Sequence, residues 1–119
     1  MQIIKPSEVK EFPLFGKVNG RIISSSDRMM FLLVELPPKG VVPEHSHPHE
    51  QMGLCLKGRA EFRSEKERAI VEEGMFYWVK PSEKHCVVSL TDKPCAFLDV
   101  FSPPREDYLE KAKKTIGQG

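Results

Sequence analysis

Short apolar segments separated by glycine and proline fill most of this chain. The segments are rich in Val, Ile, Phe and Leu, and few of the gaps between turn residues leave room for a helix. They lie at roughly 20–24, 29–36, 51–57, 59–64, 68–71, 75–79, 84–90 and 95–101. Many short strands at this spacing are typical of a sandwich or a barrel. The pattern therefore predicts an all-β fold.

One stretch shows the alternation of a half-exposed strand especially clearly. From Lys57 to Glu65 every second residue is charged, with Ala60 and Phe62 between the charges. A period of two places such charges on one face of a strand, so we expect a solvated hairpin that turns near residues 65–67. We interpret its charges as ordinary protein surface.

The good helix candidate is the C-terminal segment. Pro104 can occupy a first helical turn, acidic residues follow it, and lysines lie toward the other end, as the helix dipole favours. We expect Leu109 and Ala112 to pack this helix on the barrel.

Length and charge limit the classes of function. A chain of 119 residues, 39% of them hydrophobic, forms one domain (1–119) with its own core. With 18 basic and 17 acidic residues the formal charge is +1, and no basic block is present, so we expect no nucleic-acid partner. The longest apolar run has six residues (29–34), whereas a membrane helix needs about twenty, and the first residues lack a signal-peptide core. We therefore expect no membrane partner and a cytoplasmic location.

The histidines are unusually clustered. His45, His47 and His49 lie within five residues, and the fourth histidine, His85, follows another strand-like segment. Two histidines two apart in an extended chain point to the same side, where their imidazoles can converge on one ion. A barrel can bring His85 beside them. The pattern predicts a metal site.

These residues resemble the two motifs of a cupin, a small double-stranded β-helix or jelly-roll barrel. The first motif (40–58) is matched by Gly40, His45, His47 and Gly58, and the second (74–85) by Gly74, Pro81 and His85. Gln51 stands where the usual Glu ligand would be, and Ser89 replaces the usual trailing Asn. The resemblance implies a cupin barrel with a short C-terminal helix. It identifies the fold rather than the reaction, because cupins host many chemistries.

The resemblance implies one divalent transition metal held by His45, His47, Gln51 and His85. Ni, Zn, Fe, Mn and Co all accept such nitrogen and amide-oxygen ligands. A neutral Gln leaves the full charge on the ion, which favours an anionic substrate. The alternative is that Glu50 is the fourth ligand, because Pro48 interrupts the strand alternation that favours Gln51. We interpret His49 as a substrate-facing or exposed loop residue rather than a ligand.

A carboxylate lies within the last predicted strand. Phe97, Asp99 and Phe101 share one face of it by alternation, so Asp99 stands among aromatic residues wherever that face is buried. Burial raises the pKa of a carboxyl group, which suits a general acid or base. A carboxylate at the strand end, paired with a surface Lys or Arg, is an equally good interpretation.

The histidine motif together with the segment from Asp99 to Asp107 is similar to the pectin-degradation cupins of carbohydrate metabolism that linearise 4,5-unsaturated uronates. This similarity implies Asp99 as the proton shuttle, and Arg105 and Phe101 as residues that bind the sugar acid, with Tyr77 or Trp78 as further apolar surface. For the aromatic residues, core packing is the simpler interpretation. The alternatives are another cupin enzyme (a dioxygenase or a sugar isomerase), a non-catalytic small-molecule-binding cupin, or a vestigial site. Cupins of this kind commonly form homodimers through an N-terminal strand, here residues 2–4.

Overall fold

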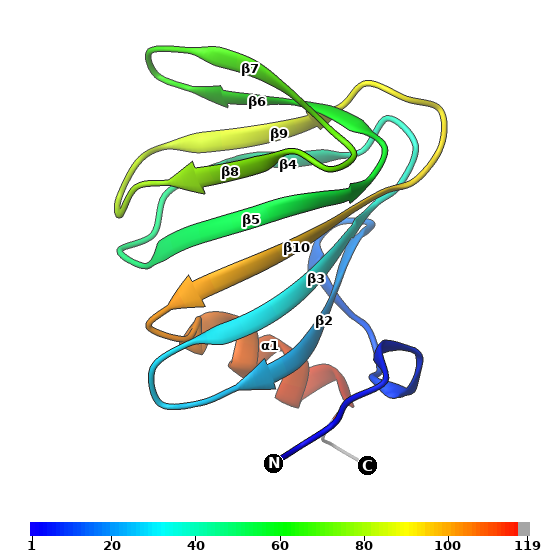
Figure 1. Cartoon of the computed structure of the whole chain (residues 1–119), viewed down its shortest axis with the longest axis vertical. Helices are drawn as coiled ribbons and strands as arrows, with labels where there is room; N and C mark the ends of the chain where they lie inside the picture. The colour runs from blue at the N-terminus through cyan, green and yellow to red at the C-terminus, as the bar shows by residue number, and fades with distance from the viewer. Residues whose placement is uncertain (117–119) are drawn as a thin grey trace.

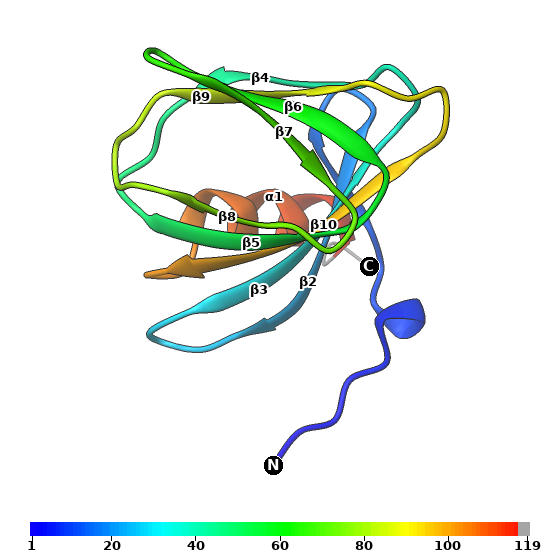
Figure 2. The ribbon, with the colours of Figure 1, turned by 45° about the horizontal axis from the view of Figure 1, so that its top comes forward.

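The computed structural model describes residues 1–116, which form two antiparallel β-sheets facing each other, with one helix (Figures 1 and 2). The six-stranded sheet has the order β1-β2-β3-β10-β5-β8 and the four-stranded sheet the order β4-β9-β6-β7. The strands are β1 (Phe12–Phe15), β2 (Val18–Ser25), β3 (Met30–Leu36), β4 (Val41–His45), β5 (Glu50–Lys57), β6 (Arg59–Ser64), β7 (Arg68–Glu72), β8 (Phe76–Val79), β9 (His85–Ser89) and β10 (Cys95–Ser102). A 3-10 turn covers Pro6–Glu8, and α1 is Glu106–Ile116. The predicted all-β fold with a C-terminal helix is confirmed.

Strict alternation builds the core between the sheets. β3 and β10 bury every second residue along their length. The fully enclosed side chains include Phe12, Leu32, Leu36 and Phe101. A period of two turns such residues to one face, and the facing sheet covers them.

All eight predicted strands are present, and β6 and β7 form the predicted hairpin, in which the amide of Ser64 donates to the carbonyl of Glu67. Two further strands, β1 and β4, were not predicted. Each contains a proline, Pro13 or Pro43, and each lies at a sheet edge, where a residue without an N–H is tolerated.

The C-terminal helix differs from its prediction in two respects. It begins at Glu106, so Pro104 precedes it instead of occupying its first turn. Leu109 is 40% exposed, whereas Tyr108 is 3% exposed and belongs to the core, with Ala112 packed against it. The helix is therefore rotated by about one residue from the expected orientation. Lys111 anchors it to β1 by donating a hydrogen bond from Nζ to the carbonyl of Leu14 at 2.8 Å.

Within residues 1–116 no helix has the length and apolar character needed to cross a membrane. Residues 2–4, the segment expected to form an intersubunit strand, are not in a strand of this single chain.

Candidate metal and substrate site

Three of the four histidines converge inside the barrel. His45 ends β4 and lies directly opposite His85, the first residue of β9, in the antiparallel pair. Their ring centroids are 4.3 Å apart, and the ring of His47 lies 5.1 Å from that of His85. One nitrogen of each ring lies within 4.8 Å of the other two. The structure thus brings together three of the four residues that the sequence singled out as metal ligands.

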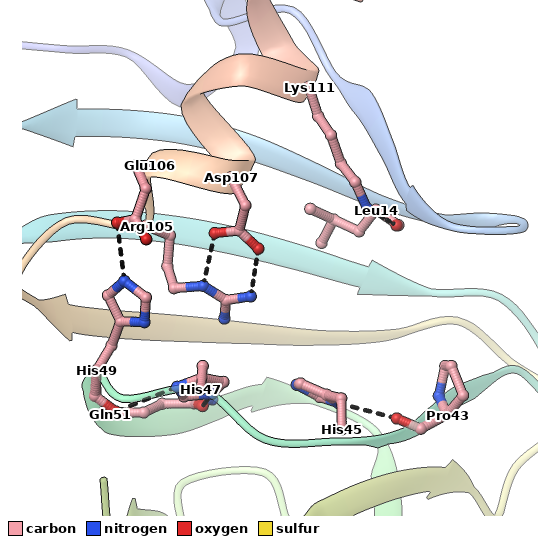
Figure 3. Close-up of polar contacts among 10 residues, drawn as sticks. All are labelled: Leu14, Pro43, His45, His47, His49, Gln51, Arg105, Glu106, Asp107 and Lys111. Carbon is pink, nitrogen blue, oxygen red and sulfur yellow. Dashed lines mark hydrogen bonds and ion pairs between the residues drawn. The ribbon is translucent and has the colours of Figure 1, made fainter. Parts of the chain in front are cut away.

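Backbone carbonyls orient these imidazoles. Nδ1 of His45 lies 2.8 Å from the carbonyl of Pro43 (Figure 3). Nδ1 of His85 lies 2.7 Å from the carbonyl of Glu83, and Nδ1 of His47 lies 3.1 Å from that of His49. A carbonyl only accepts, so each Nδ1 carries the proton and each Nε2 presents a lone pair. Histidines that bind metal ions are commonly oriented in this way, by a hydrogen bond from the ring nitrogen that does not face the ion.

Burial and neighbouring positive charge keep the three rings neutral. Burial lowers the pKa of His45 and of His85. For His47, burial and then the charge of Arg105 lower the pKa to about 4. Neutral imidazole is the form that binds a metal ion, so the site is ready for a cation near neutral pH without losing protons.

Gln51 and Glu50 point to opposite faces of β5. Gln51 is buried, and its Oε1 lies 3.1 Å from Nε2 of His47. The carboxylate of Glu50 instead accepts a hydrogen bond from Nε1 of Trp78 at 2.9 Å on the outside of the sheet. The loop at Pro48 therefore leaves the alternation intact at β5, and the inward residue is Gln51.

The contact between His47 and Gln51 tests whether these residues fit a cation. The Gln51 amide acts to lower the pKa of Asp99, as an N–H directed toward that carboxylate does, and its Oε1 lies toward His47. Since Nδ1 of His47 donates to a carbonyl, its Nε2 and Oε1 of Gln51 are two acceptors at 3.1 Å. A cation bound to both atoms would remove the repulsion between their lone pairs, so these residues fit a divalent transition metal.

Asp99 is held at the centre of three neighbouring strands. The register aligns Asp99 of β10 with Gly53 of β5, and Gly53 with Tyr77 of β8. A Cβ at Gly53 would lie 2.3 Å from Cζ of Tyr77, so the missing side chain lets the tyrosine reach across β5. There the Tyr77 hydroxyl donates to Asp99 Oδ1.

The environment of Asp99 perturbs its acidity. Asp99 is 6% exposed, and burial raises its pKa to about 6, although the hydrogen bonds from Tyr77 and Gln51 and the charge of Arg105 act in the opposite direction. The predicted burial among aromatic residues is confirmed. The alternative, a surface pair with Lys or Arg, is wrong.

Arg105 enters the site from the segment before α1. Its guanidinium carbon lies 3.8 Å from the ring centre of Tyr108 and 5.0 Å from that of Phe101. Nε and Nη2 donate to the two carboxylate oxygens of Asp107 at 3.0 and 2.8 Å (Figure 3). Within residues 1–116, Nη1 is buried without a hydrogen-bond partner. Nε and Nη2 are thus engaged with Asp107, and Nη1 remains as the donor group available to a ligand.

Phe101 is a core residue that also borders the site. It is 2% exposed and meets His47 and Tyr108 edge to face, at centroid distances of 5.6 and 6.0 Å. Together with His45, Gln51, Asp99 and Arg105 it lines a cavity of about 40 Å³. A cavity of that size holds water-sized groups. A larger cleft of about 230 Å³ between β7 and β8 reaches Tyr77 and His85.

Trp78 lies outside this site, since it is 54% exposed and points away from the barrel interior. Tyr77 faces inward and touches Asp99, so of the two aromatic residues considered it is the one at the site.

His49 is not exposed, contrary to one of the two interpretations given to it. It is 3% exposed, and its Nε2 lies 3.0 Å from Oε2 of Glu106, the first residue of α1. The bond from His49 lowers the pKa of Glu106. His49 therefore joins the histidine loop to the helix beside Arg105.

Sequence reasoning assigned neither Gly53 nor Asp107 a role at the site. Gly53 interrupts an apolar strand, and an isolated strand glycine signals close approach of another group. Asp107 follows Arg105 by two residues, and their side chains meet only because the backbone turns between them. The glycine in the strand was therefore a usable signal for Gly53, whereas the role of Asp107 depends on the local backbone conformation.

Comparison with known proteins places this geometry in a family. The family model described as "Cupin domain" matches residues 32–101. The H2HPP isomerase of Bacillus subtilis is 30% identical over 89 residues, which are 74% of this chain but only 37% of that protein. The chain thus spans little more than a third of that relative's length.

Solved structures agree on the fold. The structure of KdgF from Halomonas sp. superposes with a TM-score of 0.83 at 22% identity, covering 91% of this chain and 98% of that one. The polyketide cyclase RemF from Streptomyces resistomycificus superposes with a TM-score of 0.78 at 21% identity, covering 86% and 79%. With the domain match and the histidine pair on adjacent strands of a jelly roll, these likenesses lead to one conclusion: the chain belongs to the cupin family.

Proposed function

We propose that this cupin is a metal-dependent enzyme that opens the ring of a 4,5-unsaturated uronate to give the linear 4-deoxy-5-keto acid. One observation carries the proposal: a buried carboxylate, Asp99, lines the same cavity as His45, Gln51 and His85, and His47 converges with these neutral donors. The likeness of the Asp99–Asp107 segment to uronate-linearising cupins, and of the fold to KdgF, supports it.

His45, His47, Gln51 and His85 would hold the divalent transition ion. When bound, the ion would supply Lewis acidity toward the substrate carboxylate and the neighbouring oxygen. Because all four ligands are neutral, its positive charge would favour an anionic sugar acid over a neutral one.

Asp99 is suited to move the proton that this isomerisation requires. Loss of the proton from the C1 hydroxyl forms the C1 carbonyl as the bond between C1 and the ring oxygen breaks. The electron pair of that bond remains on the oxygen at C5. A proton added at C4 then converts the enol to the ketone, so the reaction has no net loss of atoms or electrons. In our proposal Asp99 delivers that proton, positioned by Tyr77 and Gln51.

Arg105 and Phe101 would bind the substrate. The free Nη1 of Arg105 offers donors to one oxygen of the sugar acid, and the bonds to Asp107 hold the guanidinium still. Phe101 keeps the ring of His47 in place and presents apolar surface to the cavity. Since the cavity has room for water-sized groups, the sugar ring would extend from it toward the cleft beside Tyr77.

The test follows the loss of ultraviolet absorbance of an unsaturated galacturonate, with metal-loaded protein, against the spontaneous rate. We expect acceleration by the wild type and a loss of at least ~100-fold in Asp99→Asn, the usual scale for removing a general acid or base. Asp92→Asn, which alters an exposed turn residue, is the matched control and should retain the wild-type rate. No acceleration at any metal loading would refute the proposed reaction, and full activity of Asp99→Asn would refute the shuttle.

A second candidate is an isomerase acting on a different small acid. The 30% identity to the Bacillus subtilis isomerase favours it, because an isomerase also needs one group that takes or gives a proton beside an anion-binding site. Activity on H2HPP but not on the unsaturated uronate, lost in Asp99→Asn, would select this alternative.

A further inference from the structure

Two buried nitrogen atoms beside the site have no hydrogen-bond partner among residues 1–116: Nδ1 of His49 and Nη1 of Arg105. His49 is 3% exposed and Arg105 is 4% exposed, so bulk water does not reach either atom. Leaving a buried polar atom unpaired is costly, and native proteins hold few such atoms. Two of them in one corner of the protein therefore indicate a partner that binds there.

The first turn of α1 holds both side chains in the same way. Nε2 of His49 lies 3.0 Å from Oε2 of Glu106. The guanidinium of Arg105 donates from Nε and Nη2 to the carboxylate of Asp107. Figure 3 shows that each side chain turns its bonded nitrogens toward the helix and its free nitrogen toward the metal-binding histidines. Two adjacent residues of α1 thus fix a pair of unbonded atoms at the border of the site.

The rings of His47 and Phe101 lie next to both groups. The ring centroid of His47 is 5.6 Å from that of His49 and 5.6 Å from that of Phe101. The guanidinium carbon of Arg105 is 5.0 Å from the ring centre of Phe101. Since each free atom lacks a partner among the described residues, the two do not bond each other. One ligand group placed between them would pair with both.

The two free atoms have opposite hydrogen-bonding capacity. The carboxylate of Glu106 only accepts, so Nε2 of His49 carries the proton and Nδ1 of the neutral ring has a lone pair. Nη1 of Arg105 only donates. A hydroxyl group donates one hydrogen bond and accepts others, so a single hydroxyl can pair with both atoms. A carboxylate could pair with the arginine alone.

We propose that His49 is a substrate-binding residue whose Nδ1 accepts a hydrogen bond from a ring hydroxyl of the sugar acid, while Nη1 of Arg105 donates to the oxygen of the same hydroxyl. The inference rests on the proposed function in taking the substrate to be a sugar acid. A 4,5-unsaturated uronate carries hydroxyls at C1, C2 and C3, and C1 reacts, so the hydroxyl is the one at C2 or C3. The cavity that Arg105 lines has room for a group of this size.

Equilibrium binding of two acids to the zinc-loaded protein, measured by isothermal titration calorimetry, tests the inference. Galacturonate keeps the carboxylate, the ring oxygen and the hydroxyls at C2 and C3, but it lacks the double bond and has no enol to convert. Tetrahydropyran-2-carboxylate keeps the carboxylate and the ring oxygen and has no hydroxyl. We expect the wild type to bind galacturonate ~10-fold more tightly, the scale of a hydrogen-bonded hydroxyl.

Two substitutions of His49 separate recognition of the hydroxyl from the bond to Glu106. His49→Asn retains a polar atom at the position of Nδ1 but ends short of Glu106. His49→Gln retains an amide that can reach Glu106 but has no polar atom at the position of Nδ1. We expect His49→Gln to lose ~10-fold in affinity for galacturonate and none for the acid without hydroxyls, and His49→Asn to stay within about threefold of the wild type for both. Elemental analysis and far-ultraviolet circular dichroism verify that both variants bind zinc and fold.

Several results would overturn the inference. A wild type that binds the two acids equally, or binds neither, recognises no hydroxyl. Weaker galacturonate binding in His49→Asn than in His49→Gln, or equal losses in both, would assign His49 to the bond with Glu106 alone. Failure of the proposed function is seen separately: galacturonate binding that depends on His49, without acceleration in the ultraviolet assay, would refute the ring opening and leave the hydroxyl site in place.

Discussion

Gly53 is the position where a single methyl group should disturb the site most directly. Substitution Gly53→Ala adds a Cβ that would lie 2.3 Å from Cζ and 2.4 Å from the hydroxyl oxygen of Tyr77. Carbon atoms in contact prefer ~3.5–4.0 Å, so the tyrosine ring must retreat by more than about 1 Å. The hydroxyl would then lose Asp99, because the ring cannot bend around the new methyl group.

The expected loss of stability has two parts. Overpacking in a well-packed core costs ~1–3 kcal/mol. A buried carboxylate deprived of a donor costs a further ~1–3 kcal/mol. We therefore expect Gly53→Ala to lower the free energy of unfolding by ~2–6 kcal/mol, and at this chain length each kcal/mol lowers Tm by ~3–6 °C.

Chemical denaturation of four proteins measures this effect: the wild type, Gly53→Ala, Tyr77→Ala and the double variant. Removing the tyrosine ring removes the clash, so Gly53→Ala should be neutral or slightly stabilising in the Tyr77→Ala background, as alanine generally is in place of a strand glycine. Activity on the proposed substrate should fall in Gly53→Ala together with stability, since Asp99 loses the group that positions it.

The reasoning would be refuted in either of two ways. Gly53→Ala could unfold at the same denaturant concentration as the wild type, which would mean that Tyr77 moves aside without cost. It could also cost as much with Ala at position 77 as with Tyr, which would place the conflict elsewhere.

Further predictions concern the metal and the arginine. His85→Ala should lower the divalent metal content found by elemental analysis, because it removes one of three convergent imidazoles, whereas His49→Ala should leave it unchanged; equal loss in both would contradict the ligand assignment. Arg105→Lys should lower the free energy of unfolding in urea by ~1–3 kcal/mol, because lysine can neither make the paired bonds to Asp107 nor stack on Tyr108; an unchanged midpoint would contradict this. Burial acts to raise the pKa of Asp107, but the hydrogen bonds and charge of Arg105 prevail and lower this pKa from the ordinary 3.8. The ion pair therefore stabilises the fold fully above pH 3.8, and the stabilisation is lost as the pH falls through the lowered pKa. The stability advantage of the wild type over Asp107→Asn should accordingly be constant near neutral pH and vanish in acid, and an advantage that persists in acid would exclude the ion pair as its source.

Much of the fold was predictable because alternation is a local property. A period of two identifies a strand and states which side chains share a face, and this was sufficient for eight strands and for the inward position of Asp99. The strands that escaped prediction, β1 and β4, contain Pro13 and Pro43, and their pairing depends on a neighbouring strand distant in sequence. The helix was predicted from its end charges, but its orientation follows from Tyr108, which fills a space that only the closed barrel defines.

The sequence by itself determined how polar and apolar side chains alternate along each strand. It also identified the residues from which a metal site could be built. The tertiary structure alone decided their partners. It turned Gln51 inward and Glu50 outward, set Tyr77 across Gly53 onto Asp99, occupied the fork of Arg105 with Asp107, and buried His49 against Glu106. The physical reason is that alternation specifies a face, whereas a contact requires two faces to be brought together at a given register. That register is set by the closure of the sheets around the whole core.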